Sequence, residues 1–219
     1  MRTHLFTILS VAVLFTGYAQ EKKVYTTTSG EVIFSFANIS LNGDEEGSIL
    51  RFSPVYNIQN WVNIDKSDHF GIFTGLSVRN VGVIYDRDPV TRVKARTYNL
   101  GIPIGIKLGN LSDKFLFAGY ELEFPINYKE KIFIDESKDE KRSIWFSDRT
   151  KTLNHSIMAG IQLPYGATLK FKYYLTNFYN KNYKAGDGTK PYANMDINVF
   201  YISLSFGLLK NTEFYYNND

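Results

Sequence analysis

The chain has 219 residues, a formal net charge of +3, no cysteine, and an unusually large content of 16 Tyr and 17 Phe. The absence of cysteine excludes disulfides, thiol chemistry and a lipid anchor built on cysteine. The small net charge gives no reason to expect a nucleic acid as a partner. Abundant Tyr and Phe in short segments favour strands over helices.

The first 19 residues have the layout of a secretory signal peptide. Arg2 provides a basic start, an apolar run extends from Leu5 to Phe15, and small residues flank Tyr18 before Gln20. This run is too short for a membrane helix, although a buried N-terminal helix is the alternative. We therefore predict a signal peptide at 1–19 and one mature domain at 20–219, about 200 residues long.

The clearest strand signal lies between Tyr98 and Leu108. One face of this segment would carry Tyr98, Leu100, Ile102, Ile104, Ile106 and Leu108, and the other Asn99, Gly101, Pro103, Gly105 and Lys107. A period of two indicates a strand whose faces meet different surroundings. At about 3.3 Å per residue and about 40° tilt, the segment spans roughly 25 Å, the height of the apolar band of an outer-membrane barrel.

Seven other segments carry a similar alternation. In chain order, their apolar positions are Val32, Phe34 and Phe36; Leu50, Phe52, Tyr56 and Ile58; Phe70, Ile72, Leu76 and Val78; Leu116, Ala118, Tyr120, Leu122, Phe124 and Ile126; Leu153, Ile157, Ile161 and Leu163; Leu169, Phe171, Tyr173 and Leu175; and Phe200, Ile202, Leu204, Phe206 and Leu208. Turn residues separate them. The sequence therefore predicts an all-β fold of about eight strands.

The connections between these segments alternate in length. The short ones are Asp65 to His69, Gly109 to Lys114, and Pro164 to Gly166; the long ones are Asn42 to Gly47, Asp86 to Arg92, Lys129 to Lys151, and Thr176 to Asp196. In an up-and-down barrel, alternate connections lie at the same end. Short periplasmic turns and long external loops are typical of outer-membrane barrels. We predict a single antiparallel up-and-down transmembrane β-barrel with both termini in the periplasm.

The competing architecture is a soluble, lipocalin-like binding barrel, which would turn its large apolar residues inward. Its outer wall would then consist of residues such as Gly101, Pro103, Ser203 and Ser205, with few charges for a surface in water. With the apolar face outward, rows of Leu, Ile and Phe would meet lipid. The small and polar residues would fill the narrow lumen of an eight-stranded barrel. We therefore expect the location to be the outer membrane.

Three segments resemble a known family. They are the cleavage end Tyr18-Ala19-Gln20, the run from Tyr98 through Leu100-Gly101-Ile102-Pro103 to Gly109, and the closing run Tyr201-Ile202-Ser203-Leu204-Ser205-Phe206. The chain resembles the PorT-like outer-membrane β-barrel family of Bacteroidota-type Gram-negative bacteria. The resemblance implies a barrel fold and an outer-membrane location, and it carries over no catalytic residue. Unlike many such barrels, this chain continues past its last strand, from Asn211 to Asp219.

Residues that could support catalysis or metal binding are sparse. His69 lies in a predicted turn, and His155 and Ser156 are neighbours on a predicted strand, so their side chains point to opposite faces and cannot pair. The carboxylates between Lys129 and Lys151 alternate with bases and lack the spacing of a calcium loop. We expect no catalytic residue, no cofactor and no metal site.

A set of charged residues is predicted to face the lumen. The alternation places Arg51, Arg79, Lys107, Glu121, Glu123, Lys170 and Lys172 on the inward face. Because an unpaired buried charge is costly, we expect the glutamates to pair with Arg51, Arg79 or Lys172 and to close the lumen. A wet, unpaired channel is the alternative.

These expectations favour an outer-membrane barrel with a structural, interaction or transport and assembly-support role that is not an open channel. Its expected partners are outer-membrane lipid and a protein that binds the external loops. A nucleic acid is not expected as a partner. The alternatives are a barrel-embedded lipid-modifying enzyme and the soluble exported binding barrel.

Overall fold

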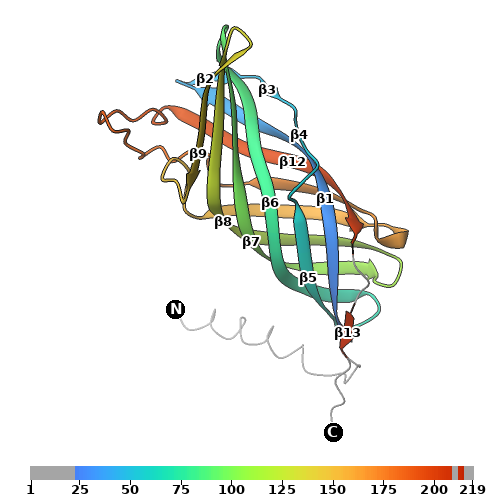
Figure 1. Cartoon of the computed structure of the whole chain (residues 1–219). Coiled ribbons are helices and arrows are strands. Elements are labelled where there is room, and N and C mark those ends of the chain that lie inside the picture. The colour runs from blue at the N-terminus through green and yellow to red at the C-terminus, as the bar shows by residue number, and fades with distance from the viewer. Residues whose placement is uncertain (1–22, 209–211, 215–219) are drawn as a thin grey trace, which may run out of the picture.

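The computed structural model describes residues 23–208 and 212–214, which form a single closed antiparallel barrel (Figure 1). Its wall consists of β1 (Lys23–Leu41), β4 (Arg51–Ser53) with β5 (Ile58–Asp65), β6 (Phe70–Asp88), β7 (Thr91–Asn110), β8 (Lys114–Ile134), β10 (Asn154–Gln162), β11 (Thr168–Tyr174) and β12 (Met195–Gly207). Consecutive wall strands pair with each other, and β1 pairs with β12 to close the ring. With β4 and β5 counted as one interrupted strand, the predicted eight-stranded up-and-down barrel is confirmed.

The two ends of the barrel differ in their connections. One end, which we call the turn end, has the connections 66–69, 111–113 and 163–167, the last of which contains the short 3₁₀ helix η2 (Pro164–Gly166). The other, the loop end, has the connections 42–50 and 175–194 and two tall hairpins. The connection 42–50 contains β2 (Asp44–Glu46), paired with β1, and β3 (Ser48–Ile49), paired with β6. Near the turn end, β13 (Thr212–Phe214) pairs with β1.

The predicted long loop from Asp86 to Arg92 is wrong. Strand β6 continues to Asp88 and β7 begins at Thr91, so only two residues connect the two strands. The cause is the inward face of this hairpin, where Val81, Val83, Tyr85, Val93 and Ala95 are all buried. Burial of that apolar face keeps the two strands paired above the loop-end rim.

The predicted loop from Lys129 to Lys151 is also largely a hairpin. Strand β8 extends to Ile134 and turns directly into β9 (Ser137–Trp145), which runs back antiparallel to it. Strands β6 to β9 therefore form a sheet extension above the loop-end rim (Figure 1). Within the described residues, β9 pairs with β8 alone, so its other edge is open.

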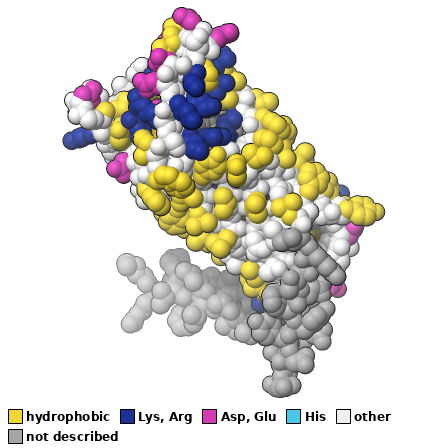
Figure 2. Space-filling view, in the orientation of Figure 1, with side chains coloured by type: hydrophobic (Ala, Val, Ile, Leu, Met, Phe, Trp, Pro, Cys, Tyr) yellow, Lys and Arg dark blue, Asp and Glu magenta, His cyan; other side chains and the backbone are white. Residues whose placement is uncertain are grey.

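Large apolar side chains cover the outside of the barrel (Figure 2). On β7, Ile102 is 46% exposed and Ile104 is 64% exposed, although both lie in the middle of a long strand. The same outward pattern recurs at Leu76, Leu100, Ile106, Leu108, Leu116, Phe124, Ile157, Leu169, Phe171, Ile202, Leu204 and Phe206. The predicted orientation of the faces, with the large apolar residues outside, is confirmed.

Two apolar clusters fill parts of the lumen. The upper apolar cluster lies towards the loop end and includes Ile33, Val81, Val83, Tyr85, Val93, Tyr128, Tyr174, Phe178, Tyr179, Tyr192, Ile197, Val199 and Tyr201. The lower apolar cluster lies towards the turn end and consists of Trp61, Phe73, Leu111, Phe115, Phe117 and Met158. Both clusters contain several aromatic rings, and in the lower cluster Trp61 stacks on Phe73 at 4.2 Å between ring centroids.

No helix in the part of the chain that the structure describes is long and apolar enough to cross a membrane. The predicted signal peptide, residues 1–19, lies outside the described residues.

Candidate functional site

Six charged side chains lie in the lumen between the two apolar clusters. They are Glu31 on β1, Arg79 on β6, Glu121 and Glu123 on β8, and Lys170 and Lys172 on β11. All six side chains have 0% exposure. We call this group the luminal charge cluster. Alternation along each strand places these side chains inside, because their immediate neighbours in sequence point out of the barrel.

Arg79 is at the centre of the luminal charge cluster. Its Nε donates to Glu31 Oε2 at 3.1 Å, one Nη contacts Glu121, and the same Nη lies 3.6 Å from Glu123 Oε1. The other Nη donates to Gln59 Oε1 at 3.0 Å. One guanidinium group therefore contacts three carboxylates on two strands that lie apart in the ring. Its planar, forked donors are suited to this arrangement.

The two lysines complete the pairing. Lys170 Nζ lies 2.8 Å from Glu31 Oε1, and Lys172 Nζ lies 2.7 Å from Glu121 Oε2. Lys172 also contacts Glu123. Three cations thus face three carboxylates, and the luminal charge cluster has no net charge. Buried ions are tolerated in a low dielectric only when they are paired in this way.

Neutral side chains supply further hydrogen bonds to the carboxylates. Asn99 Nδ2 and the Tyr174 hydroxyl each donate to Glu123 Oε2 at 2.7 Å. Ser203 donates to Glu31, and Ser77 donates to Glu121. Because each carboxylate has both charged and neutral donors, the arrangement is typical of a rigid structural network. It offers no free carboxylate for acid–base chemistry.

The structure separates two of the predicted luminal residues from this group. Arg51 is 8% exposed and donates to the Asn80 carbonyl oxygen at 3.1 Å and to Asn80 Oδ1 at 2.5 Å, and it has no carboxylate partner among the described residues. Lys107 lies nearer the turn end, 2.5 Å from Asp65 Oδ1, and donates to the Tyr25 hydroxyl at 3.0 Å.

Glu31 belongs to the cluster but is absent from the residues predicted from sequence. A usable signal existed, because Glu31 has the opposite parity to the outward residues Val32 and Phe34. That parity alone places its carboxylate in the lumen.

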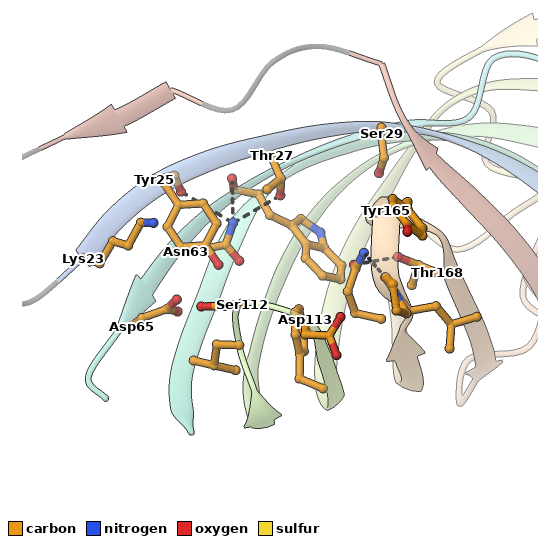
Figure 3. Close-up of a pocket in the computed structure, with 18 of the residues that line it drawn as sticks. Lys23, Tyr25, Thr27, Ser29, Asn63, Asp65, Ser112, Asp113, Tyr165 and Thr168 are labelled. Carbon is orange, nitrogen blue, oxygen red and sulfur yellow. Dashed lines mark hydrogen bonds between the residues drawn. The ribbon is translucent and has the colours of Figure 1, made fainter. Parts of the chain in front are cut away.

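A cavity of about 760 Å³ opens at the turn end of the lumen. Its lining is mostly polar and includes Thr27, Asn63 and Thr168 (Figure 3), and it also contains Trp61 and Phe115 of the lower apolar cluster. Asn63 Nδ2 donates to Thr27 Oγ1 at 3.1 Å across β5 and β1. No residue of the upper apolar cluster lines the cavity, so this opening ends inside the barrel.

The two histidines of the predicted mature domain have local contacts. His69 Nδ1 lies 3.3 Å from the Gly109 carbonyl oxygen between two turns, and His155 contacts the Tyr120 hydroxyl. Ser156 is fully buried and donates to the Glu121 carbonyl oxygen at 3.1 Å, so it faces the lumen, away from His155. Within residues 23–208 and 212–214, no group of three or more His, Asp or Glu side chains is placed to hold a metal ion.

No family model and no curated protein match the sequence. Among solved structures, the chain is similar to Ail, the attachment invasion locus protein of Yersinia pestis, in complex with the heparin analogue sucrose octasulfate (8% identity, 85% of this chain and 99% of that chain, TM-score 0.40). It is also similar to Neisserial surface protein A, with 10% identity over 86% of this chain and 100% of that chain and a TM-score of 0.41. A further similar structure is the outer membrane protein OprG from Pseudomonas aeruginosa, with 10% identity over 87% of this chain and 98% of that chain and a TM-score of 0.36.

Proposed function

We propose that this chain is an outer-membrane β-barrel protein with a structural, interaction or transport and assembly-support role, and that it is not an open channel. The observation that carries the proposal is the band of exposed Leu, Ile and Phe side chains on the barrel wall. Soluble monomers rarely expose contiguous apolar patches larger than a few hundred Å². A closed barrel satisfies its backbone hydrogen bonds internally, as a structure in lipid must.

The interior supports the same placement. Buried charges and hydroxyls line the middle of the lumen, whereas the outer wall between the turn end and Tyr98 is apolar. A soluble binding barrel has the reverse arrangement, with an apolar interior and a polar exterior. The chemistry of the two faces therefore favours lipid around the barrel over water.

Orientation, export and family are part of the same proposal. The short connections would face the periplasm and the tall hairpins would face outwards, as in outer-membrane barrels. Residues 1–19 would direct export and be removed before Gln20. Membership of the PorT-like family is proposed from the resemblance in sequence pattern. We propose no enzymatic role, because His155 and Ser156 lie on opposite faces of β10.

The location has a direct test. We expect the mature protein to begin at Gln20 and to remain with the outer-membrane fraction through carbonate washing, because its apolar wall would otherwise be exposed to water. N-terminal sequencing and extraction with and without detergent measure both points. Release of the folded protein without detergent would contradict the membrane location.

The closed lumen has its own test. In planar bilayers, we expect no steady conductance from the unmodified barrel, because the upper apolar cluster, the luminal charge cluster and the lower apolar cluster lie in series along the lumen. The double variant Trp61→Ala with Phe115→Ala removes two side chains that line the turn-end cavity and serves as the control. It should also remain closed, and steady openings from the unmodified protein would refute the closed barrel.

A further inference from the structure

A group of cations lies on the outer face of the sheet extension, just above the apolar band. It consists of Lys94 and Arg96 on β7, Lys129 and Lys131 on β8, and Lys141 on β9, and we call it the basic patch. Arg96 lies directly opposite Lys129, Lys94 opposite Lys131, and Lys131 opposite Lys141. Directly opposite residues share a face of the sheet, so the five side chains form one surface. Figure 2 shows dark blue side chains gathered in this region above yellow ones.

The basic patch has an excess of positive charge. None of its five residues forms an ion pair with a carboxylate in the described part of the chain. The nearby Arg92 differs, because its Nε donates to Asp86 Oδ1 at 2.7 Å. Like charges directly opposite each other destabilise a sheet. Two rows of opposed cations are therefore a costly arrangement unless an anion lies over them.

Aromatic rings connect the basic patch to the apolar band. The Arg96 guanidinium lies 5.4 Å and Lys129 Nζ lies 5.1 Å from the centre of the Tyr98 ring. Lys94 Nζ lies 4.7 Å from the centre of the Phe133 ring. Below Tyr98, the same face of β7 continues with Leu100 and Ile102, which are exposed. Tyr commonly marks the boundary between the hydrocarbon and the headgroups.

The height of the basic patch matches the headgroup layer. Arg96 is two residues and Lys94 four residues beyond Tyr98, so at about 3.3 Å per residue and about 40° tilt they lie roughly 5 and 10 Å above it. The headgroup layer on each side of a bilayer is roughly 5–8 Å thick, so the backbone at Arg96 lies within it and the backbone at Lys94 lies just above it, within reach of the long lysine side chain. An anion that covers the patch would thus belong to the surrounding lipid.

We propose that the basic patch binds the phosphate groups of outer-leaflet lipids, which fixes the depth and rotation of the barrel in the membrane. Within each row, neighbouring cations lie on adjacent strands about 4.8 Å apart. Two such rows suit a headgroup that carries more than one phosphate, such as that of a phosphorylated glycolipid. This inference rests on the proposed outer-membrane location. It adds a specific lipid contact to that location.

The test uses the full mature chain in a neutral detergent, titrated with bisphosphorylated lipid A, monophosphorylated lipid A and phosphatidylcholine. We expect the affinity to rise with the number of phosphates and to fall with added salt. The triple variant Lys94→Gln, Lys129→Gln, Lys131→Gln should weaken lipid A binding by roughly 100-fold, about fivefold for each charge. Thermophoresis of the labelled protein gives the dissociation constants.

The matched control is Lys66→Gln, Lys184→Gln, Lys190→Gln, which removes the same charge from exposed positions away from the patch and should bind like the unmodified protein. Binding of the patch variant within twofold of the unmodified protein would overturn the proposal. Tighter binding of soluble polyphosphate than of lipid A would also overturn it. Fractionation of both variants separates the proposed lipid site from the proposed outer-membrane location. If both variants stay in the outer membrane while the patch variant binds lipid A normally, the lipid site is wrong and the location stands.

Discussion

Replacement of Arg79 by methionine is expected to lower the free energy of unfolding by about 3–5 kcal/mol, because it leaves buried charge uncompensated. Arg79 contacts three carboxylates whose side chains have no exposed surface. Without it, three buried anions would face only Lys170 and Lys172. Urea unfolding of the barrel in lipid vesicles, followed by tryptophan fluorescence, measures the loss.

A double variant distinguishes charge balance from lost packing. Arg79→Met with Glu121→Gln leaves two cations and two carboxylates and retains the Lys170–Glu31 and Lys172–Glu123 contacts. The Glu121→Gln change should therefore lower the free energy of unfolding much less in the Arg79→Met protein than in the unmodified one. Equal costs in the two backgrounds would mean that the residues are not energetically coupled.

Replacement of Tyr179 by alanine is expected to release the connection 175–194 from the barrel mouth and to cost about 3–5 kcal/mol, as for other large buried aromatic residues. Tyr179 has no exposed surface, and its ring stacks on Tyr192 at 4.2 Å between centroids. It also contacts Phe178 edge-on and pairs through its backbone with Thr150. Trypsin should then cleave after Lys181 or Lys184 while the wall strands remain intact.

The matched control is Tyr165→Ala at the turn end, because Tyr165 is fully exposed. This variant should have the same free energy of unfolding as the unmodified protein and the same resistance to trypsin. Unchanged resistance of the Tyr179→Ala protein would mean that the aromatic stack does not hold the connection.

The wall of the barrel was predictable because two different environments impose a strict period of two. From Leu100 to Leu108, every second residue is large and apolar, and the structure exposes each of these residues on the outer face. Strand ends were less predictable, since they depend on burial above the rim. Strand β6 continues past the expected loop boundary at Asp86 to Asp88, because Val81, Val83 and Tyr85 just below it are buried in the upper apolar cluster.

The membership of the luminal charge cluster was predictable only in part. Parity gives the direction in which a side chain points, and it does so for Arg79, Glu121, Glu123, Lys170 and Lys172. It does not give height, because height depends on register and on interruptions in the strands. Arg51 illustrates the limit: the chain leaves the ladder between β4 and β5, where Tyr56 has a φ of 61°, and Arg51 lies beside Asn80.

The open edge of β9 has a consequence for how the protein behaves when crowded in a membrane. Unpaired backbone groups on an exposed strand can template pairing with another chain, and natural proteins block this with charged residues. Strand β9 carries five consecutive charged residues, from Lys138 to Arg142, along that edge. Two copies that met edge to edge would have to bury these charges against each other. The tall hairpin can therefore project from the rim without joining neighbouring copies into a continuous sheet.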